Sequence, residues 1–327
     1  MDSKQAAHYR SHRINRSFFF LRCKPDTGVC TMNASPNRAA WFLPMGAGIS
    51  WGLIGPFVRH LGDAGLTGMA IIAVRSAVVA LVLFPALALR RPADLRILPR
   101  DLWIFLGTGI GSIVFFNWCY FTTIRTASLS VACTLMYGAP AFVLLMSALF
   151  FRERLTLRKA AVCLLAFLGC ALVSGWLSPG AAPARIPAAS LLTGLGSAFG
   201  YALYSIFGRY AAARGYRTAT LTAWTFLIAT LGTLPFLDLP ALAAIYRAAP
   251  SLWLWTLSLG LLITLLPYLL YSAALRRMET GRASLLSSIE PVIATLVGLF
   301  LYREPLTLPI LLGILLVLGA LSLLPRR

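Results

Sequence analysis

The sequence Ser287-Ser288-Ile289-Glu290-Pro291 lies within an apolar run that extends from residue 283 to residue 302. Glu290 is the one carboxylate in that run, and a proline follows it directly. A run of about 20 apolar residues is long enough to cross a bilayer as a helix. A carboxylate at that depth costs a few kcal/mol when it faces lipid, so Glu290 predicts a cavity or a polar partner. Because proline lacks a backbone donor, we also expect the helix to open locally beside it.

The composition indicates a membrane protein. The chain has 327 residues, of which 59% are hydrophobic and 12% charged, and its mean hydropathy is +0.79. A soluble domain of this length cannot cover so much apolar surface. Short loops separate ten apolar runs, which predict an all-α integral membrane protein with ten transmembrane helices. The runs span residues 41–59, 67–88, 102–123, 128–150, 158–177, 189–210, 219–236, 252–274, 282–302 and 308–324.

Residues 1–40 are polar, basic and without hydrophobic periodicity. They predict a disordered cytoplasmic tail, or an upstream extension that precedes a natural start at Met32. We expect this segment to lie outside the folded membrane domain.

The net charge of +19 is distributed in a way that predicts topology. With the N-terminus inside and every run crossing, 23 of the 29 Lys and Arg residues lie inside and five lie outside. Arg75 is the remaining one, within the second run. The positive-inside rule then places both termini in the cytoplasm. Basic residues spread over every inner loop do not form the concentrated patch of a nucleic-acid surface, so we expect no nucleic-acid partner.

The residues that usually carry catalysis or metal binding are sparse. Neither the six cysteines nor the three histidines have metal-ligand or redox spacing, and no nucleophile lies near a base. We therefore expect no enzyme activity, no cofactor and no metal. Five tryptophans at run ends predict an interfacial aromatic belt: Trp41, Trp103, Trp176, Trp253 and Trp255.

The two halves of the chain resemble each other at an offset of about 151 residues. Tyr120 matches Tyr271, Pro140 matches Pro291, and residues 151–156 match residues 302–307. This divides the chain into a first five-helix repeat (41–177), a linker (178–188) and a second repeat (189–327). Because five is odd, the second copy enters the membrane from the opposite side, which predicts inverted repeats. A duplication kept only for packing is the alternative.

Each repeat carries a small-residue stretch leading to a proline, then a glutamate separated by one residue from Leu-Thr, then a glycine in the last helix. The first copy reads Ser128-Leu129-Ser130-Val131-Ala132 up to Pro140, Arg152-Glu153-Arg154-Leu155-Thr156 and Gly169. The second reads Ala283 to Pro291, Arg303-Glu304-Pro305-Leu306-Thr307, Gly313 and Gly319. With Trp51-Gly52 and Arg75, these motifs resemble the drug/metabolite transporter superfamily, in particular its EamA type, over residues 40–324.

The resemblance implies a secondary active transporter, an exporter of small metabolites such as amino acids, driven by protons or another gradient. It places the chain in the plasma membrane, here a bacterial inner membrane, with a small-molecule substrate and the lipid bilayer as partners. The chain is expected to act as a monomer or a homodimer. The alternatives are a nucleotide-sugar-like or drug carrier of the same superfamily, a membrane enzyme acting on lipids and a non-transporting membrane subunit. A nucleotide-sugar carrier would need more basic residues in its cavity than Arg75 alone.

The resemblance also implies a central cavity lined by helices one, three, four, six, eight and nine. Tyr201, Tyr204 and Ser205 share one helix face, so they fit such a lining. Tyrosines of an interfacial belt are the alternative. The substrate-binding candidates are Trp51, Asn117, Tyr120, Tyr137, Tyr201, Tyr204, Ser205, Tyr268, Tyr271 and Ser288.

Arg75 and Glu290 each lie about eight residues from a run end, which places both near mid-membrane. We interpret them as a coupling pair in which Glu290 exchanges a proton. A static ion pair between helices is the alternative. Glu153 and Glu304 lie at predicted helix ends, where we expect them to cap helices.

Overall fold

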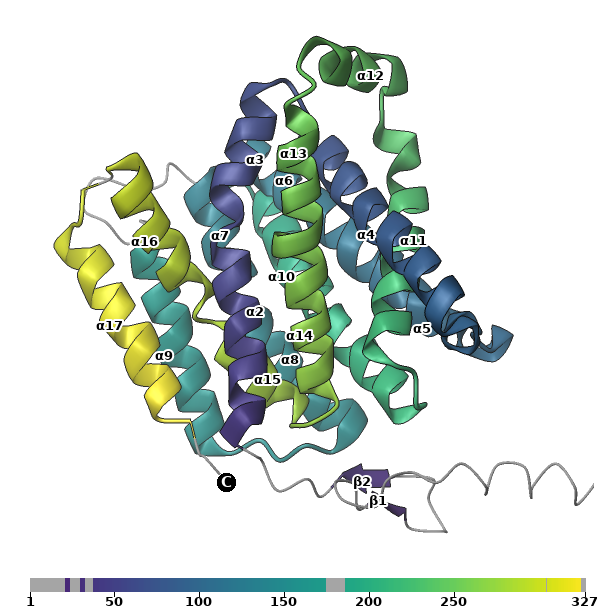
Figure 1. Ribbon diagram of the computed structural model, residues 1–327. Helices are drawn as coiled ribbons and strands as arrows, with labels where there is room; N and C mark the ends of the chain where they lie inside the picture. The colour runs from purple at the N-terminus through teal and green to yellow at the C-terminus, as the bar shows by residue number, and fades with distance from the viewer. Residues whose placement is uncertain (1–20, 24–29, 33–37, 175–185, 304, 325–327) are drawn as a thin grey trace, which may run out of the picture.

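The computed structural model describes residues 21–23, 30–32, 38–174, 186–303 and 305–324, and its helices form one bundle (Figure 1). Each of the ten predicted runs is helical over most of its described residues. Helices of the first half are α2 (Phe42–Gly52), α3 (Ile54–Asp63), α4 (Gly68–Arg90), α5 (Leu102–Leu106), the π-helix η4 (Gly107–Val114), α6 (Phe115–Thr126), α7 (Leu129–Met136), α8 (Ala139–Phe151) and α9 (Leu157–Val173).

The second half has a similar order of elements, but the single helix α10 (Ala188–Ala213) takes the place of α2 and α3, and α12 (Leu239–Ala248) is added. Its helices are α10 (Ala188–Ala213), α11 (Thr218–Thr233), α12 (Leu239–Ala248), α13 (Leu252–Ser258), the π-helix η6 (Leu259–Leu265), α14 (Leu266–Leu275), α15 (Thr280–Ser287), α16 (Glu290–Tyr302) and α17 (Leu308–Ser322). The short helix α12, which the sequence did not predict, lies at the upper end of the bundle in Figure 1. Asp238 explains where α12 begins, because its carboxylate accepts a hydrogen bond from the N–H of Ala241 at 3.0 Å.

The remaining short elements lie in loops and in the N-terminal segment. Single turns of 3-10 helix are η1 (Arg38–Trp41), η2 (Pro92–Leu95), η3 (Pro99–Asp101) and η5 (Leu234–Phe236). Strands β1 (Leu21–Cys23) and β2 (Cys30–Met32) pair antiparallel, with Leu21 opposite Met32. The rest of the predicted tail, Trp176, linker residues 178–185 and the predicted cap Glu304 lie outside the described residues.

Within the described ranges, seven helical segments are long and apolar enough to cross a membrane, and α17 is a shorter apolar helix. The seven are 68–90, 99–126, 129–151, 188–213, 218–236, 252–275 and 280–302. Run one is interrupted at Leu53, and α9 has 17 residues. Apolar side chains cover the outer surface; Leu149, for example, is 75% exposed. The chain is therefore a multi-pass membrane protein, whereas ten crossings remain a prediction.

The predicted opening beside Glu290 is confirmed. Run nine is broken between Ser287 and Glu290, and Pro291 occupies the first turn of α16, where its missing N–H is not needed. At the end of α15, the N–H of Ser288 bonds to the carbonyl of Leu285 at 3.1 Å, three residues back, where an α-helix would use the carbonyl four residues back. The first half has the same break at Tyr137 and Gly138, just before Pro140.

Other local features recur in both halves. The π-helices begin at Gly107 and Leu259. Arg152 and Arg303 both adopt a left-handed conformation with φ of 55°. Two glycines also recur, at Gly65 with φ of 97° and Gly215 with φ of 85°, where only a residue without a side chain is unstrained. These matches support an internal duplication.

The two halves are interlocked. Helix α2 of the first half packs against α14, α15 and α16 of the second, while α10 of the second half packs against α6, α7 and α8 of the first. Helices α4 and α11 pack together, as do α9 and α17. At the last crossing a Cβ on Gly169 would lie 2.8 Å from the Gly313 carbonyl oxygen, so small residues permit the close approach. Residues from both halves therefore meet at the centre.

Candidate functional site

An aromatic cluster occupies the centre of the bundle. The ring of Trp51 on α2 lies 5.3 Å from Tyr268 and 5.5 Å from Tyr271, both on α14. It lies 6.2 Å from Tyr201 on α10, and Tyr204 is 4.9 Å from Tyr268. Most of these contacts are edge-to-face, the geometry that aromatic quadrupoles prefer. Five predicted site residues from three helices are thus brought together.

Hydrogen bonds tie α10 to α14 beside these rings. The hydroxyls of Tyr204 and Ser272 are 2.8 Å apart, and those of Ser205 and Tyr271 are also 2.8 Å apart. Tyr204, Ser205 and Tyr271 are all buried. Buried tyrosines that pair with serines inside the bundle are not belt residues, because a belt tyrosine lies at the membrane surface.

Glu290 lies at the break between α15 and α16. Its Oε2 accepts a hydrogen bond from the hydroxyl of Tyr201 at 3.4 Å, and the residue is half-buried. It lines a cavity of about 10 Å³, which has room for about one water. The other lining residues are Met136, Tyr137, Ala139, Pro140, Tyr201, Ser284, Ser287 and Ser288. The carboxylate therefore faces a small cavity that serine and tyrosine side chains line in part, as the sequence predicted.

Arg75 does not form an ion pair with Glu290, the partner that we predicted for it. It is buried on α4, and its Nε has no hydrogen-bond partner in the part of the chain that is described. None of the ion pairs between described residues joins Arg75 to Glu290, so the expected direct pairing is not formed in this conformation. Glu290, by contrast, accepts a hydrogen bond from Tyr201 of the aromatic cluster.

The three candidates from helices three and four differ in their surroundings. The Asn117 amide donates to the Ile113 carbonyl of its own helix at 2.7 Å, so its hydrogen-bonding capacity is partly used locally. The Tyr120 hydroxyl lies 3.0 Å from Cys133 Sγ. Tyr137 lines the Glu290 cavity, whereas Tyr120 is not among its lining residues.

Sequence reasoning missed several residues of the site. Ser272 pairs with Tyr204, Cys133 pairs with Tyr120, and the Phe116 ring lies 5.5 Å from Tyr201. Ser284 and Ser287 line the Glu290 cavity together with Ser288. Their spacing of i, i+3 and i+4 marks one helix face, a signal that could have identified both from sequence.

Two glycines of α2 allow it to approach the break in run nine. A Cβ on Gly48 would lie 2.5 Å from the Ser287 carbonyl oxygen, and one on Gly52 would lie 2.7 Å from that of Glu290. Ser287 is the residue whose carbonyl Pro291 leaves without its usual helical donor. Because these glycines have no side chain, α2 packs closely against the start of α16, and this packing brings the turn that carries Trp51 close to the turn that carries Glu290.

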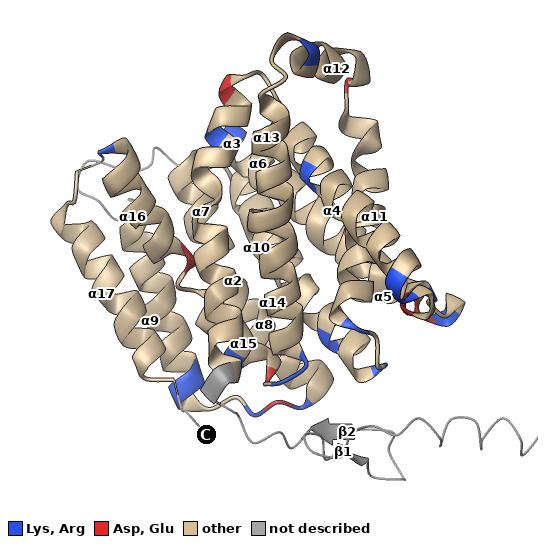
Figure 2. Ribbon diagram, in the orientation of Figure 1, with Lys and Arg blue, Asp and Glu red and all other residues tan. Residues whose placement is uncertain are grey.

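A polar network closes one end of the bundle. The Glu153 carboxylate accepts hydrogen bonds from the N–H groups of Thr280 at 2.7 Å and Gly281 at 3.2 Å, which confirms its predicted role as a helix cap. Nearby, Lys159 Nζ lies 2.8 Å from Glu279 Oε2. Arg209 on α10 donates to the Leu275 and Met278 carbonyls. Figure 2 shows charged residues concentrated at the ends of the bundle and few between them.

The two repeats differ at their equivalent ends. All residues from Thr280 to Ser288 are buried, whereas residues 127–129, which precede and begin α7 at the equivalent point of the first repeat, are exposed. The bundle is thus more tightly closed where α15 begins than where α7 begins.

Comparison with known families defines the class of protein. The model of the EamA-like transporter family matches residues 38–175 and again residues 188–325. This chain therefore belongs to the EamA-like transporter family, with two copies of the family domain.

Relatives are described as transporters. An uncharacterized transporter of Archaeoglobus fulgidus is 27% identical over 80% of this chain and 87% of its own length. The YxxF protein of Bacillus subtilis, also an uncharacterized transporter, is 27% identical over 56% of this chain, and the match spans 58% of that relative. The threonine/homoserine exporter RhtA of Escherichia coli is 29% identical over 62% of this chain and 64% of its own length.

A solved crystal structure has the same fold. It superposes with a TM-score of 0.71 over 87% of this chain and 96% of its own length, at 19% sequence identity. At that identity the likeness concerns the fold alone.

Proposed function

We propose that this protein is a proton-coupled secondary transporter that exports small metabolites such as amino acids across the bacterial inner membrane. The observation that carries the proposal is the Glu290 carboxylate, bonded to Tyr201 in a small polar cavity at a helix break inside the membrane domain. Intramembrane carboxylates of this kind serve as proton relays in transporters. The relation to a protein named as a threonine/homoserine exporter supports an amino-acid substrate.

The arrangement of the repeats supports alternating access. Equivalent breaks, at Tyr137–Gly138 and Ser288–Ile289, allow the two halves of runs four and nine to move separately. In our proposal the repeats are inverted, the chain crosses ten times and both termini are cytoplasmic. The end closed by Glu153 is then the cytoplasmic end, so this conformation is closed to the cytoplasm.

The substrate space must form by rearrangement. A cavity of about 10 Å³ holds about one water, so it has no room for an amino acid. We propose that separation of α2 and α10 from the helix breaks widens it between Trp51, Tyr201 and Glu290. The tyrosine rings then provide apolar faces with hydroxyl groups at their edges, which suit a small amphipathic solute.

Counterflow in proteoliposomes tests this function. Purified protein is reconstituted into liposomes preloaded with one unlabelled amino acid, and uptake of the labelled form is followed with and without a pH gradient. We expect counterflow for a subset of amino acids and acceleration by the gradient. Absence of counterflow across amino acids, with counterflow of a nucleotide sugar, would favour the carrier alternative, for which the buried Arg75 supplies a cation.

A further inference from the structure

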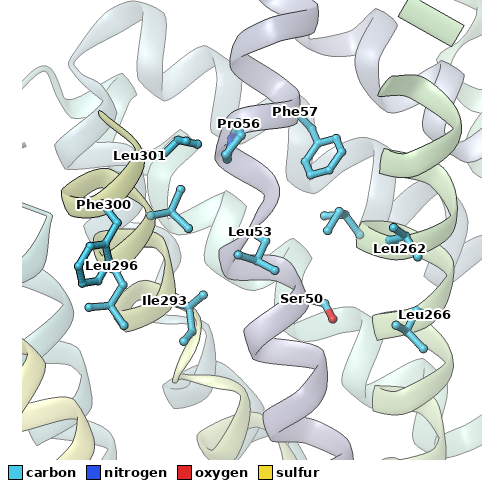
Figure 3. A pocket seen from close by; sticks show the side chains of 12 residues that line it. Ser50, Leu53, Pro56, Phe57, Leu262, Leu266, Ile293, Leu296, Phe300 and Leu301 are labelled. Atoms are coloured by element: carbon cyan, nitrogen blue, oxygen red, sulfur yellow. The ribbon is translucent and has the colours of Figure 1, made fainter. Parts of the chain in front are cut away.

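A second cavity, separate from Glu290, opens on the outer face of the bundle (Figure 3). It is a groove of about 610 Å³ between α2–α3, η6 and α16. Its walls are apolar side chains such as Leu53, Phe57, Leu262, Leu296 and Phe300, and Ser50 is the one hydroxyl-bearing residue among them. Phe300 is 78% exposed, so the groove faces the surrounding membrane rather than the aromatic cluster.

The groove has the length of one membrane leaflet. Along α16 its lining extends from Ile293 to Leu301, which at 1.5 Å per residue is about 12 Å. Half of a hydrocarbon core of about 30 Å is about 15 Å. A hydrocarbon chain of one leaflet therefore fits the groove lengthwise.

One end of the groove carries a cation among aromatic rings. Arg59, two residues after Phe57, places its guanidinium carbon 4.5 Å from the centre of the Tyr302 ring, directly after Leu301. Beside it His60 stacks on Trp255 at 4.3 Å, and Phe57 contacts the same tryptophan. Tryptophan and tyrosine rings of this kind lie at headgroup level. None of the ion pairs between described residues involves Arg59, although Asp63 follows one turn later on α3.

We propose that this groove is a binding site for one phospholipid with an anionic headgroup. One acyl chain lies along Leu53, Leu262 and Leu296, and the phosphate lies against Arg59 and Tyr302. Charge complementarity at the Arg59 end selects the headgroup. The groove adds packing but little selectivity, because a lipid chain leaves an equally apolar bilayer to enter it.

Native mass spectrometry of the full chain tests this site. Delipidated protein in detergent is titrated with dioleoyl-phosphatidylglycerol or with dioleoyl-phosphatidylcholine, which differ only in the headgroup. We expect one tightly bound phosphatidylglycerol and weaker phosphatidylcholine. Arg59→Gln should weaken phosphatidylglycerol binding about fivefold, the effect of one arginine beside an anionic lipid, and reduce the preference. Arg125→Gln, at an exposed arginine at the end of α6, is the matched control and should retain the preference.

A second pair of variants tests the groove itself. Leu262→Trp fills it and should remove the tight lipid, whereas Leu254→Trp, at a site on α13 that is 70% exposed and outside the groove, should not. Equal binding of both lipids by the unaltered protein, or an unchanged tight lipid in both Arg59→Gln and Leu262→Trp, would overturn the proposal. A dimer of the unaltered protein that Leu262→Trp dissociates and Leu254→Trp does not would also overturn it, because the groove would then be occupied by a second copy of the chain.

Discussion

The carboxylate of Glu153 caps the first turn of α15 by accepting a hydrogen bond from the N–H of Thr280 at 2.7 Å. The residues lie 127 positions apart and belong to different repeats. This contact joins the end of α8 to the start of the segment that leads to Glu290. The cap therefore ties the two repeats together at this end of the bundle.

We expect Glu153→Gln to weaken this closure. The amide retains one acceptor oxygen but loses the charge, so the cap should lose about 1 kcal/mol. A cysteine placed at Thr280, which is buried, should then react faster with a thiol reagent. Asp238→Asn, at the cap of the peripheral helix α12, is the matched control and should leave that reactivity unchanged. Unchanged reactivity in Glu153→Gln would show that the cap does not hold the end closed.

Glu290→Gln separates proton coupling from structural support. The variant keeps the side-chain shape and an acceptor for Tyr201 but cannot titrate. We expect it to lose gradient-driven accumulation and to keep substrate exchange. Since no ion pair with Arg75 is formed, the free energy of unfolding should change by less than about 1 kcal/mol. The measurements are uptake against a pH gradient and the Tm in detergent, with Asp63→Asn as the control. Full gradient-driven transport by the variant would refute the coupling role.

Gly52→Ala should force α2 away from the helix break. The new methyl group would lie 2.7 Å from the Glu290 carbonyl oxygen and 2.6 Å from Ile293 Cβ, so overpacking should cost about 1–3 kcal/mol. Transport should fall together with the Tm. Gly55→Ala, one turn further along the same run, has no heavy atom within 4 Å of the added carbon and should be tolerated. Equal effects of the two substitutions would contradict the close approach.

Reporter fusions test the predicted topology. A fusion after Arg185 should report the external side, and one after Arg214 the cytoplasmic side, because one crossing separates them. Alkaline phosphatase and a fluorescent protein, active on opposite sides, provide independent readouts. Fusions that report the same side would contradict inverted repeats.

Deletion of residues 2–31 should leave membrane insertion and transport intact. The segment has no apolar face for packing, and the one sheet in the described part of the chain pairs β1 only with β2. Membrane fractionation and counterflow are the measurements. Loss of insertion would show that the tail has a role in assembly.

The sequence by itself determined the helical runs, the duplication and the break before Pro291. The length of an apolar run predicts a helix, and a proline predicts where that helix opens. Glu153 and Glu304 are separated by the same 151 positions as the other matched residues, which predicts a repeat. All of these signals can be read along the chain without knowledge of its packing. The depth of Glu290 followed from the same one-dimensional information. Even the capping role of Glu153 was visible, although its partner was not.

Only the tertiary structure decided which residues meet at the centre. Depth along a helix fixes neither its rotation nor its neighbours, so Arg75 matched Glu290 in depth, yet none of the ion pairs between described residues joins them. Trp51 of the first half joins tyrosines of the second because Gly48 and Gly52 let α2 pack closely against run nine. The sequence also did not show that the Asn117 amide donates to the Ile113 carbonyl, which uses part of its hydrogen-bonding capacity. Such choices depend on side-chain packing between segments far apart in the chain, which no local pattern specifies.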